Sequence, residues 1–208
     1  MKNSSVLILL ASILVGCGSQ PQSPPSDQQK AAMPPKSVSP AVSRLADAVA
    51  ADAADAFDRF VKDRGEDKIM ALAFVTVDDA VTPYIMGGTQ DDFGPIRGTE
   101  DSFGAYPPDW SWNDDGHRYR CDPIIREMLR DQPDSFKEHG RDIFEGIVAG
   151  LKQFNESGRF KSKLPRERML LILWIHDPAK HNATQMKAWA KETNPPSVAE
   201  WLDANFPF

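Results

Sequence analysis

Cysteine is scarce in this chain, which has two cysteines, Cys17 and Cys121, among 208 residues. A disulfide-rich scaffold is therefore excluded, and the fold has to rest on a hydrophobic core. The remaining composition, 41% hydrophobic and 26% charged, excludes a collagen-like, coiled-coil or wholly disordered chain. This length allows one domain or two small ones.

A long hydrophobic run is also lacking. The apolar stretch at residues 6–16 is too short for a transmembrane helix, which needs about 20 residues. Because this stretch follows Lys2, it is typical of the hydrophobic region of a secretory signal peptide.

The end of this stretch, Leu14-Val15-Gly16-Cys17, resembles the lipobox of bacterial lipoproteins. The resemblance implies that residues 1–16 are a signal peptide and that Cys17 is acylated, with palmitate expected, and becomes the new N-terminus. The alternative is an ordinary signal peptide with an incidental cysteine. Several acyl chains on one residue anchor a protein durably in a membrane. Gly18 follows the cysteine in place of an aspartate, which favours the outer membrane, with the protein facing the periplasm.

Residues 17–40 combine the acylated cysteine with a segment rich in proline, serine and glutamine. Such a segment has too few large apolar residues to offset the entropy lost on folding, so we interpret it as a tether. The globular part is then 41–208, where 21 Lys and Arg oppose 29 Asp and Glu, a net charge of −8. This acidic balance argues against nucleic acid as a partner.

Hydrophobic periodicity predicts an α+β domain in which helices pack on a mostly antiparallel sheet. A helix is expected from Ser39 or Ser43 to Arg64, since apolar residues recur every three or four positions. Runs 69–77 and 169–175 are apolar on both alternations, which predicts strands covered on both faces, and the strand at 69–77 is expected to be central in its sheet. The other expected elements are an edge strand over 81–86 that contains Pro83, a strand near 110–112, helices beginning at Asp122 and Asp134, and helices over 184–193 and 197–204.

Three short motifs resemble the bacterial family catalogued as domain of unknown function 4303. They are the strand segment Ala71-Leu72-Ala73-Phe74, the Trp110-Ser111-Trp112 patch, and a late strand ending at 174–178 that is followed by Asn194-Pro195-Pro196. The resemblance covers most of 41–205 and implies a family without an established activity. Some such domains lie near toxin–immunity loci, which implies an interaction role.

Two polar clusters are candidate sites, in a sequence without a nucleophile elbow, a paired CxxC or a phosphate-binding loop. His176 and Asp177 follow a predicted strand, and these residue types bind metals or transfer protons. An ordinary turn is the plainer interpretation. The segment 113–117, which ends at His117, could bind a divalent ion, but a hairpin turn through Asp-Gly is the plainer interpretation.

Aromatic and basic residues supply two further candidate surfaces. Tyr106, Trp110 and Trp112 would form either an exposed recognition surface or part of the core, and the core is the plainer interpretation. The basic residues between Arg159 and Arg168 would form either a positive patch or a solvated loop.

The leading hypothesis is a membrane-anchored envelope lipoprotein that acts as a non-enzymatic binding or protein-interaction module, with an immunity protein as a narrower version. The candidate binding surface comprises Tyr106, Trp110, Trp112, His117, His176 and Asp177. The alternative is a metal-dependent hydrolase built on His176, Asp177 and His117, which requires His117 and His176 to converge in one cleft. We expect no cofactor.

Overall fold

The computed structural model describes residues 39–77, 83–93, 106–114, 116–130, 136–176, 178 and 180–205. Cys17, Asp134 and Asp177 lie outside the described residues. The described residues belong to one unit, Ser37–Phe208. Its elements are α1 (Pro40–Arg64), η1 (Glu66–Lys68), β1 (Ile69–Val77), β2 (Tyr84–Thr89), α2 (Gln90–Phe93), η3 (Pro107–Asp109), β3 (Trp112–Asn113), α3 (Cys121–Arg130), α4 (Phe136–Glu156), η4 (Arg166–Arg168), β4 (Leu170–His176), α5 (Lys180–Thr193) and α6 (Pro196–Asn205).

The sheet has four strands in the order β3-β2-β1-β4. β1 pairs antiparallel with β2 and parallel with β4, and β2 pairs antiparallel with β3. The predicted α+β class is confirmed, and the sheet is mixed, since one of its three pairings is parallel. The central position predicted for 69–77 is also confirmed.

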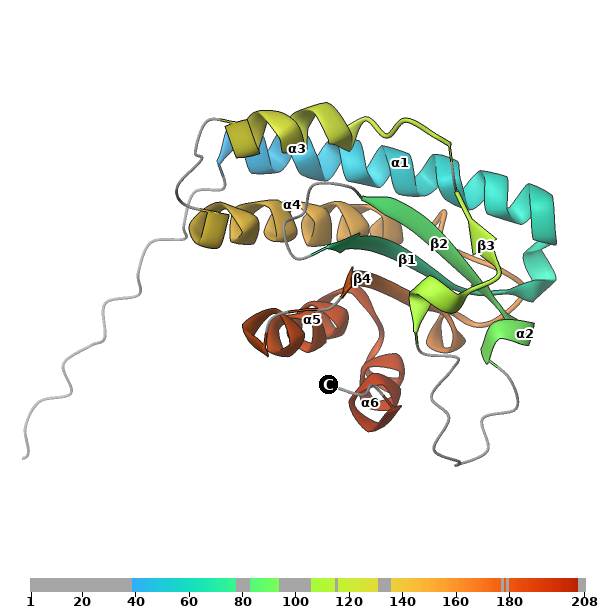
Figure 1. Cartoon of the computed structure of the whole chain (residues 1–208). Coiled ribbons are helices and arrows are strands. Elements are labelled where there is room, and N and C mark those ends of the chain that lie inside the picture. The colour runs from blue at the N-terminus through green and yellow to red at the C-terminus, as the bar shows by residue number, and fades with distance from the viewer. Residues whose placement is uncertain are drawn as a thin grey trace, which may run out of the picture. The chain divides into compact units, whose positions relative to one another are not determined.

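Helices cover both sides of the sheet. Figure 1 shows α1, α3 and α4 on one side, and α5 and α6 on the other side and along the β4 end. Side chains alternate along β4, so that Leu171 and Leu173 pack with the α1–α4 core while Leu170 and Ile172 pack with the α6 core. Two cores therefore share one sheet, which lies buried between them.

Helix α1 begins and ends where the sequence predicts. The Ser39 hydroxyl accepts a hydrogen bond from the backbone N–H of Val42, and Gly65 follows the helix with a φ of 85°. Its apolar face packs on the buried stripe of α4, which consists of Ile143, Phe144, Ile147, Val148, Leu151 and Phe154.

Two glycines of α4 let these helices approach closely. A Cβ at Gly146 would lie 2.8 Å from Leu45, and a Cβ at Gly150 would lie 2.6 Å from the carbonyl oxygen of Ala46. The GxxxG spacing thus marks close helix packing inside the domain. No helix in the described part of the chain is long and apolar enough to cross a membrane.

The edge position predicted for strand 81–86 is wrong, because β2 lies between β1 and β3. The strand begins at Tyr84, so Pro83 precedes it and removes no ladder hydrogen bond. The strand continues through Gly87 and Gly88 to Thr89. A Cβ at Gly87 would lie 2.4 Å from the Phe60 ring, so this strand needs glycine where α1 crosses it.

The strand predicted at 169–175 is buried on both faces, as expected, and β4 ends the described sheet. Its outer edge is nevertheless occupied by side chains of the following helix. Asn194 accepts from the Leu171 N–H at 2.8 Å and donates to the Leu171 carbonyl at 2.6 Å, and Thr193 donates to the same carbonyl at 2.9 Å. These contacts cover the strand edge and block further pairing there.

Helix α3 begins at Cys121, one residue before the predicted start, and takes its N-terminal cap from α1. The buried Asp52 carboxylate accepts from the backbone N–H groups of Arg120 and Cys121, both at 3.0 Å. The Arg120 guanidinium adds ion pairs to Asp52 and Asp55. This explains why a carboxylate interrupts the apolar face of α1.

Candidate functional site

The first predicted cluster, around Asp114 and His117, links α1 to the sheet. The buried Asp114 carboxylate accepts two hydrogen bonds from Arg59, at 2.8 and 2.6 Å. The Tyr119 hydroxyl donates to Asp114 Oδ2 at 3.2 Å, and His117 Nε2 lies 3.6 Å from Oδ1. A bidentate guanidinium and a phenol therefore occupy the oxygens that a metal ion would need.

The electrostatics of this cluster favour a fixed ion pair. Hydrogen bonding to Asp114 raises the pKa of Arg59. Burial, followed by the negative charge of Asp114, raises the pKa of the Tyr119 hydroxyl, so Tyr119 keeps its proton. Gly116 has a φ of 81°, a backbone conformation that glycine adopts without strain.

The second predicted cluster lies at the end of β4. His176 Nδ1 lies 2.9 Å from the Tyr106 hydroxyl, and the Tyr106 ring meets Trp174 edge-on with centroids 5.4 Å apart. The structure thus brings together Tyr106 and His176 from the predicted surface. Asp177, the third member of this group, lies outside the described residues.

The two histidines lie on opposite sides of the sheet. His176 follows the alternation of Ile172 and Trp174, whose side chains pack in the α6 core. His117 instead approaches Asp114, which is paired to Arg59 of α1 on the other side. Among the described residues, no group of three or more His, Cys, Asp or Glu is placed to hold a metal ion. The convergence that the metal-dependent hydrolase requires does not occur between these histidines.

The two tryptophans are buried, which agrees with the core interpretation and contradicts an exposed aromatic surface. Trp112 stacks on Phe60 with ring centroids 4.7 Å apart, and its Nε1 donates to Asp63 at 3.1 Å. Trp110 is 4% exposed and lies 5.5 Å from the Phe93 ring. β3 begins at Trp112, close to the strand predicted near 110–112.

The second cysteine is equally internal. Cys121 is fully buried at the start of α3, and burial, together with the charge of Asp52, raises the pKa of its thiol. A thiol reacts as the thiolate, so this cysteine is inert in the folded state.

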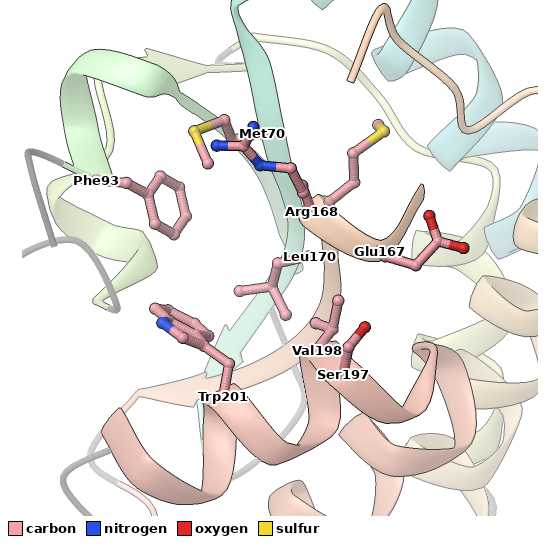
Figure 2. A pocket seen from close by; sticks show the side chains of 9 residues that line it. Met70, Phe93, Glu167, Arg168, Leu170, Ser197, Val198 and Trp201 are labelled. Carbon is pink, nitrogen blue, oxygen red and sulfur yellow. The ribbon is translucent and has the colours of Figure 1, made fainter. Parts of the chain in front are cut away.

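The structure contains a pocket that the sequence analysis did not predict. Its cavity volume is about 270 Å³, and it opens on the α6 side of the sheet. Figure 2 shows Phe93, Trp201, Leu170 and Val198 around a common space. The complete lining consists of Met70, Phe93, Glu167, Arg168, Met169, Leu170, Ser197, Val198 and Trp201.

Phe93 is positioned through its neighbour Asp92. The Asp92 carboxylate accepts from the N–H and hydroxyl of Thr89, at 2.6 and 2.7 Å, and from the N–H and hydroxyl of Ser111, at 2.8 and 3.1 Å. Four hydrogen bonds thus hold the short helix α2 between the end of β2 and the start of β3. The Phe93 ring meets Trp201 of α6 with centroids 6.2 Å apart.

Arg168 is positioned through Arg166, two residues earlier in η4. The Arg166 guanidinium donates to Asn155, to the backbone carbonyls of Met169 and Thr193, and to Asn194. These acceptors are neutral, so burial lowers the pKa of Arg166 to about 10, although the charge of Glu167 opposes the shift. Arg166 therefore fastens η4 to the α5–α6 junction and sets the wall that carries Arg168.

The basic segment divides into residues with different roles. Arg159 pairs with Asp58 of α1, and Arg166 is internal. Lys161 and Lys163 are exposed. Arg168 is exposed at the pocket wall and has no ion-pair partner among the described residues.

The fold and the pocket together define an α+β domain with a mainly apolar cavity beside the guanidinium of Arg168, which forms no ion pair within the described residues. The chain belongs to the family Domain of unknown function (DUF4303), whose profile matches residues 49–195. This confirms the resemblance that the short motifs indicated. The matched region includes Met70, Phe93 and Arg168 but ends before Trp201. No curated protein and no solved structure matches the chain.

Proposed function

We propose that this chain is an envelope lipoprotein, anchored by acylated Cys17, whose domain binds a partner protein through the pocket of Phe93, Arg168, Leu170 and Trp201. The pocket is the observation that carries the proposal. Pockets lined by aromatic and aliphatic side chains receive the anchoring residues of protein partners, which supply most of the binding energy. The lipobox sequence and the tether support the location at the membrane, with the outer membrane favoured.

The size of the cavity fits an anchoring side chain of a protein partner. Sites for small molecules have volumes of about 300–1,000 Å³. A cavity of about 270 Å³ falls just below this range and suits one large side chain. The domain therefore acts as a binding module, and its other contacts with the partner would surround this anchor.

The anchor is tested by replacing the cysteine. Cys17→Ser should release the protein from membranes washed with high salt, because one residue carries all the acyl chains. A variant that stays with the membranes after this wash would contradict the lipoprotein part of the proposal.

The binding role is tested by cross-linking in the producing bacterium. Trp201→Ala removes one wall of the pocket. The partner protein that is cross-linked to the wild-type protein should therefore be absent from the proteins cross-linked to this variant. Tyr84→Ala is the matched control, since it truncates another half-buried aromatic residue outside the pocket. Melting curves establish that both variants fold. Retention of every partner by a folded Trp201→Ala protein would refute binding through this pocket.

A further inference from the structure

We infer that the pocket recognises the carboxy-terminal residue of the partner protein, with an aromatic side chain in the cavity and the terminal carboxylate on Arg168. This inference rests on the proposed function and names the chemistry of the partner. It follows from the arrangement of the wall, the charge of Arg168 and the volume of the cavity.

The wall selects an aromatic or large apolar group. Leu170 and Val198, 3% and 5% exposed, form an apolar floor, and Phe93 and Trp201 stand at one side. Aromatic rings pack favourably against other rings at offset or edge-to-face angles, beyond the gain from burying their surface. Phe93 and Trp201 already meet at 51°, so a third ring can pack against both.

The charge at the wall selects an anion. Figure 2 shows the Arg168 guanidinium beside Met70 and the Glu167 carboxylate directed away from Phe93 and Trp201. Glu167 also lines the cavity, so the positive group of Arg168 shares the lining with one carboxylate, and that carboxylate points away from the aromatic wall. A guanidinium offers parallel N–H donors that fit a carboxylate.

Arg168 is available because the fold does not use its charge. Five other arginines form ion pairs with carboxylates, and Arg166 is saturated by neutral acceptors. Within the described residues, Arg168 has no such partner. The domain is acidic overall, so a free guanidinium at an apolar cavity is a local site for one negative group and not a general attraction for acidic proteins.

The volume favours a ring and a carboxylate that belong to the same residue. A cavity of about 270 Å³ accepts one large side chain, and Arg168 lines that cavity. An internal aromatic residue carries no carboxylate on its own backbone, whereas a carboxy-terminal one does. The geometry therefore points to a chain end.

The test uses three short peptides and the whole chain carrying Cys17→Ser, so that neither acyl chains nor detergent compete for the pocket. The peptides are acetyl-Gly-Ser-Gly-Phe with a free carboxylate, the same peptide as its amide, and acetyl-Gly-Phe-Ser-Gly with a free carboxylate. Binding is followed by NMR through the indole N–H of Trp201, at affinities that are roughly millimolar for ligands of this size.

We expect the free acid with terminal phenylalanine to bind about twofold to fivefold more tightly than its amide, as for a partly exposed ion pair with good geometry. Arg168→Gln should reduce this ratio to about one while the amide still binds. Lys161→Gln is the matched control, because it removes one charge from the same loop outside the pocket and should leave the ratio unchanged.

Three results would overturn the inference: equal binding of acid and amide, equal binding of the peptide with internal phenylalanine, or no shift of Trp201 with any peptide. Arg168→Lys provides a second variant, which keeps the charge and should retain part of the preference. If the peptides fail while Trp201→Ala still abolishes cross-linking, the pocket binds a partner of different chemistry and the proposed function stands. If cross-linking is also unaffected, both fail.

Discussion

Alanine at Gly150 tests the packing of α1 on α4, on which the larger core depends. The added Cβ would lie 2.6 Å from the carbonyl oxygen of Ala46 and 2.6 Å from the Cβ of Val49. A backbone oxygen cannot rotate away from this contact, so the two helices have to separate locally. At Gly146 the nearest atom is Cδ2 of Leu45 at 2.8 Å, the end of a flexible side chain.

Both substitutions gain helix propensity, and they differ in the steric cost of the added Cβ. Alanine gains about 1 kcal/mol over glycine in a helix interior. Overpacking a core costs about 1–3 kcal/mol, and the backbone clash at Gly150 belongs at the upper end of that range. We therefore expect Gly150→Ala to lose about 1–2 kcal/mol of unfolding free energy, and Gly146→Ala to be about neutral.

Urea unfolding of the chain from Ser37 onward measures both free energies. For a domain with an m-value of about 2 kcal/mol/M, the midpoint of Gly150→Ala should fall by about 0.5–1 M. Gly146→Ala is the internal control for helix propensity, because it makes the same chemical change in the same helix. Equal midpoints for the two variants would refute the close approach of α1 to α4.

Three further predictions concern the core and its ionisable groups. Leu173→Ala should cost about 2–5 kcal/mol in urea unfolding, because Leu173 is 2% exposed in a two-sided strand; a negligible cost would contradict its burial. Cys121 should resist iodoacetamide in the native Cys17→Ser protein and react in urea, while reducing agent leaves the melting temperature unchanged; rapid native labelling would contradict its buried, protonated thiol. Folding raises the pKa of Tyr119 above the ordinary tyrosine value of 10.0, which applies to the unfolded chain. The stability that the bound proton provides is therefore fully present below pH 10.0 and is lost as the pH rises further. Tyr119→Phe should flatten this decline of the urea midpoint, and an unchanged slope would argue against a shifted tyrosine.

The regular elements could be predicted because their signal is local. The apolar stripes of α1 and α4 follow the helical period, and the two strands apolar on both alternations are buried on both faces. The position of a strand within the sheet depends on its pairing with strands that are distant in the sequence. Pro83 indicated an edge strand only because the start of β2 was expected three residues too early, at 81 in place of Tyr84.

The pocket could not be predicted because its residues come from four separate segments of the chain. Met70 is the second residue of β1, Phe93 ends α2, Arg168 ends η4, and Trp201 lies in α6. Each of these residues is unremarkable in its own segment, and Phe93 lies in a stretch without periodicity. Their convergence depends on the sheet order and on two polar anchors, Asp92 and Arg166, whose partners are distant in sequence.

The charged residues that the sequence analysis could not assign fall into two classes once their hydrogen-bond partners are known: those that join elements of the fold, and those that are available to a ligand. Asp52, Asp114 and Arg166 each form several hydrogen bonds with groups of the domain itself, and each fastens one element to another. Such residues stabilise the fold, and their charged groups are engaged inside it. Arg168 comes from the same basic segment as Arg166, but it lines a cavity and its guanidinium is not used by the described fold. The sequence alone does not distinguish these two arginines. Their hydrogen-bond partners do, because the charge of Arg166 is engaged inside the domain and that of Arg168 is available for binding. For this reason the candidate site is at Arg168.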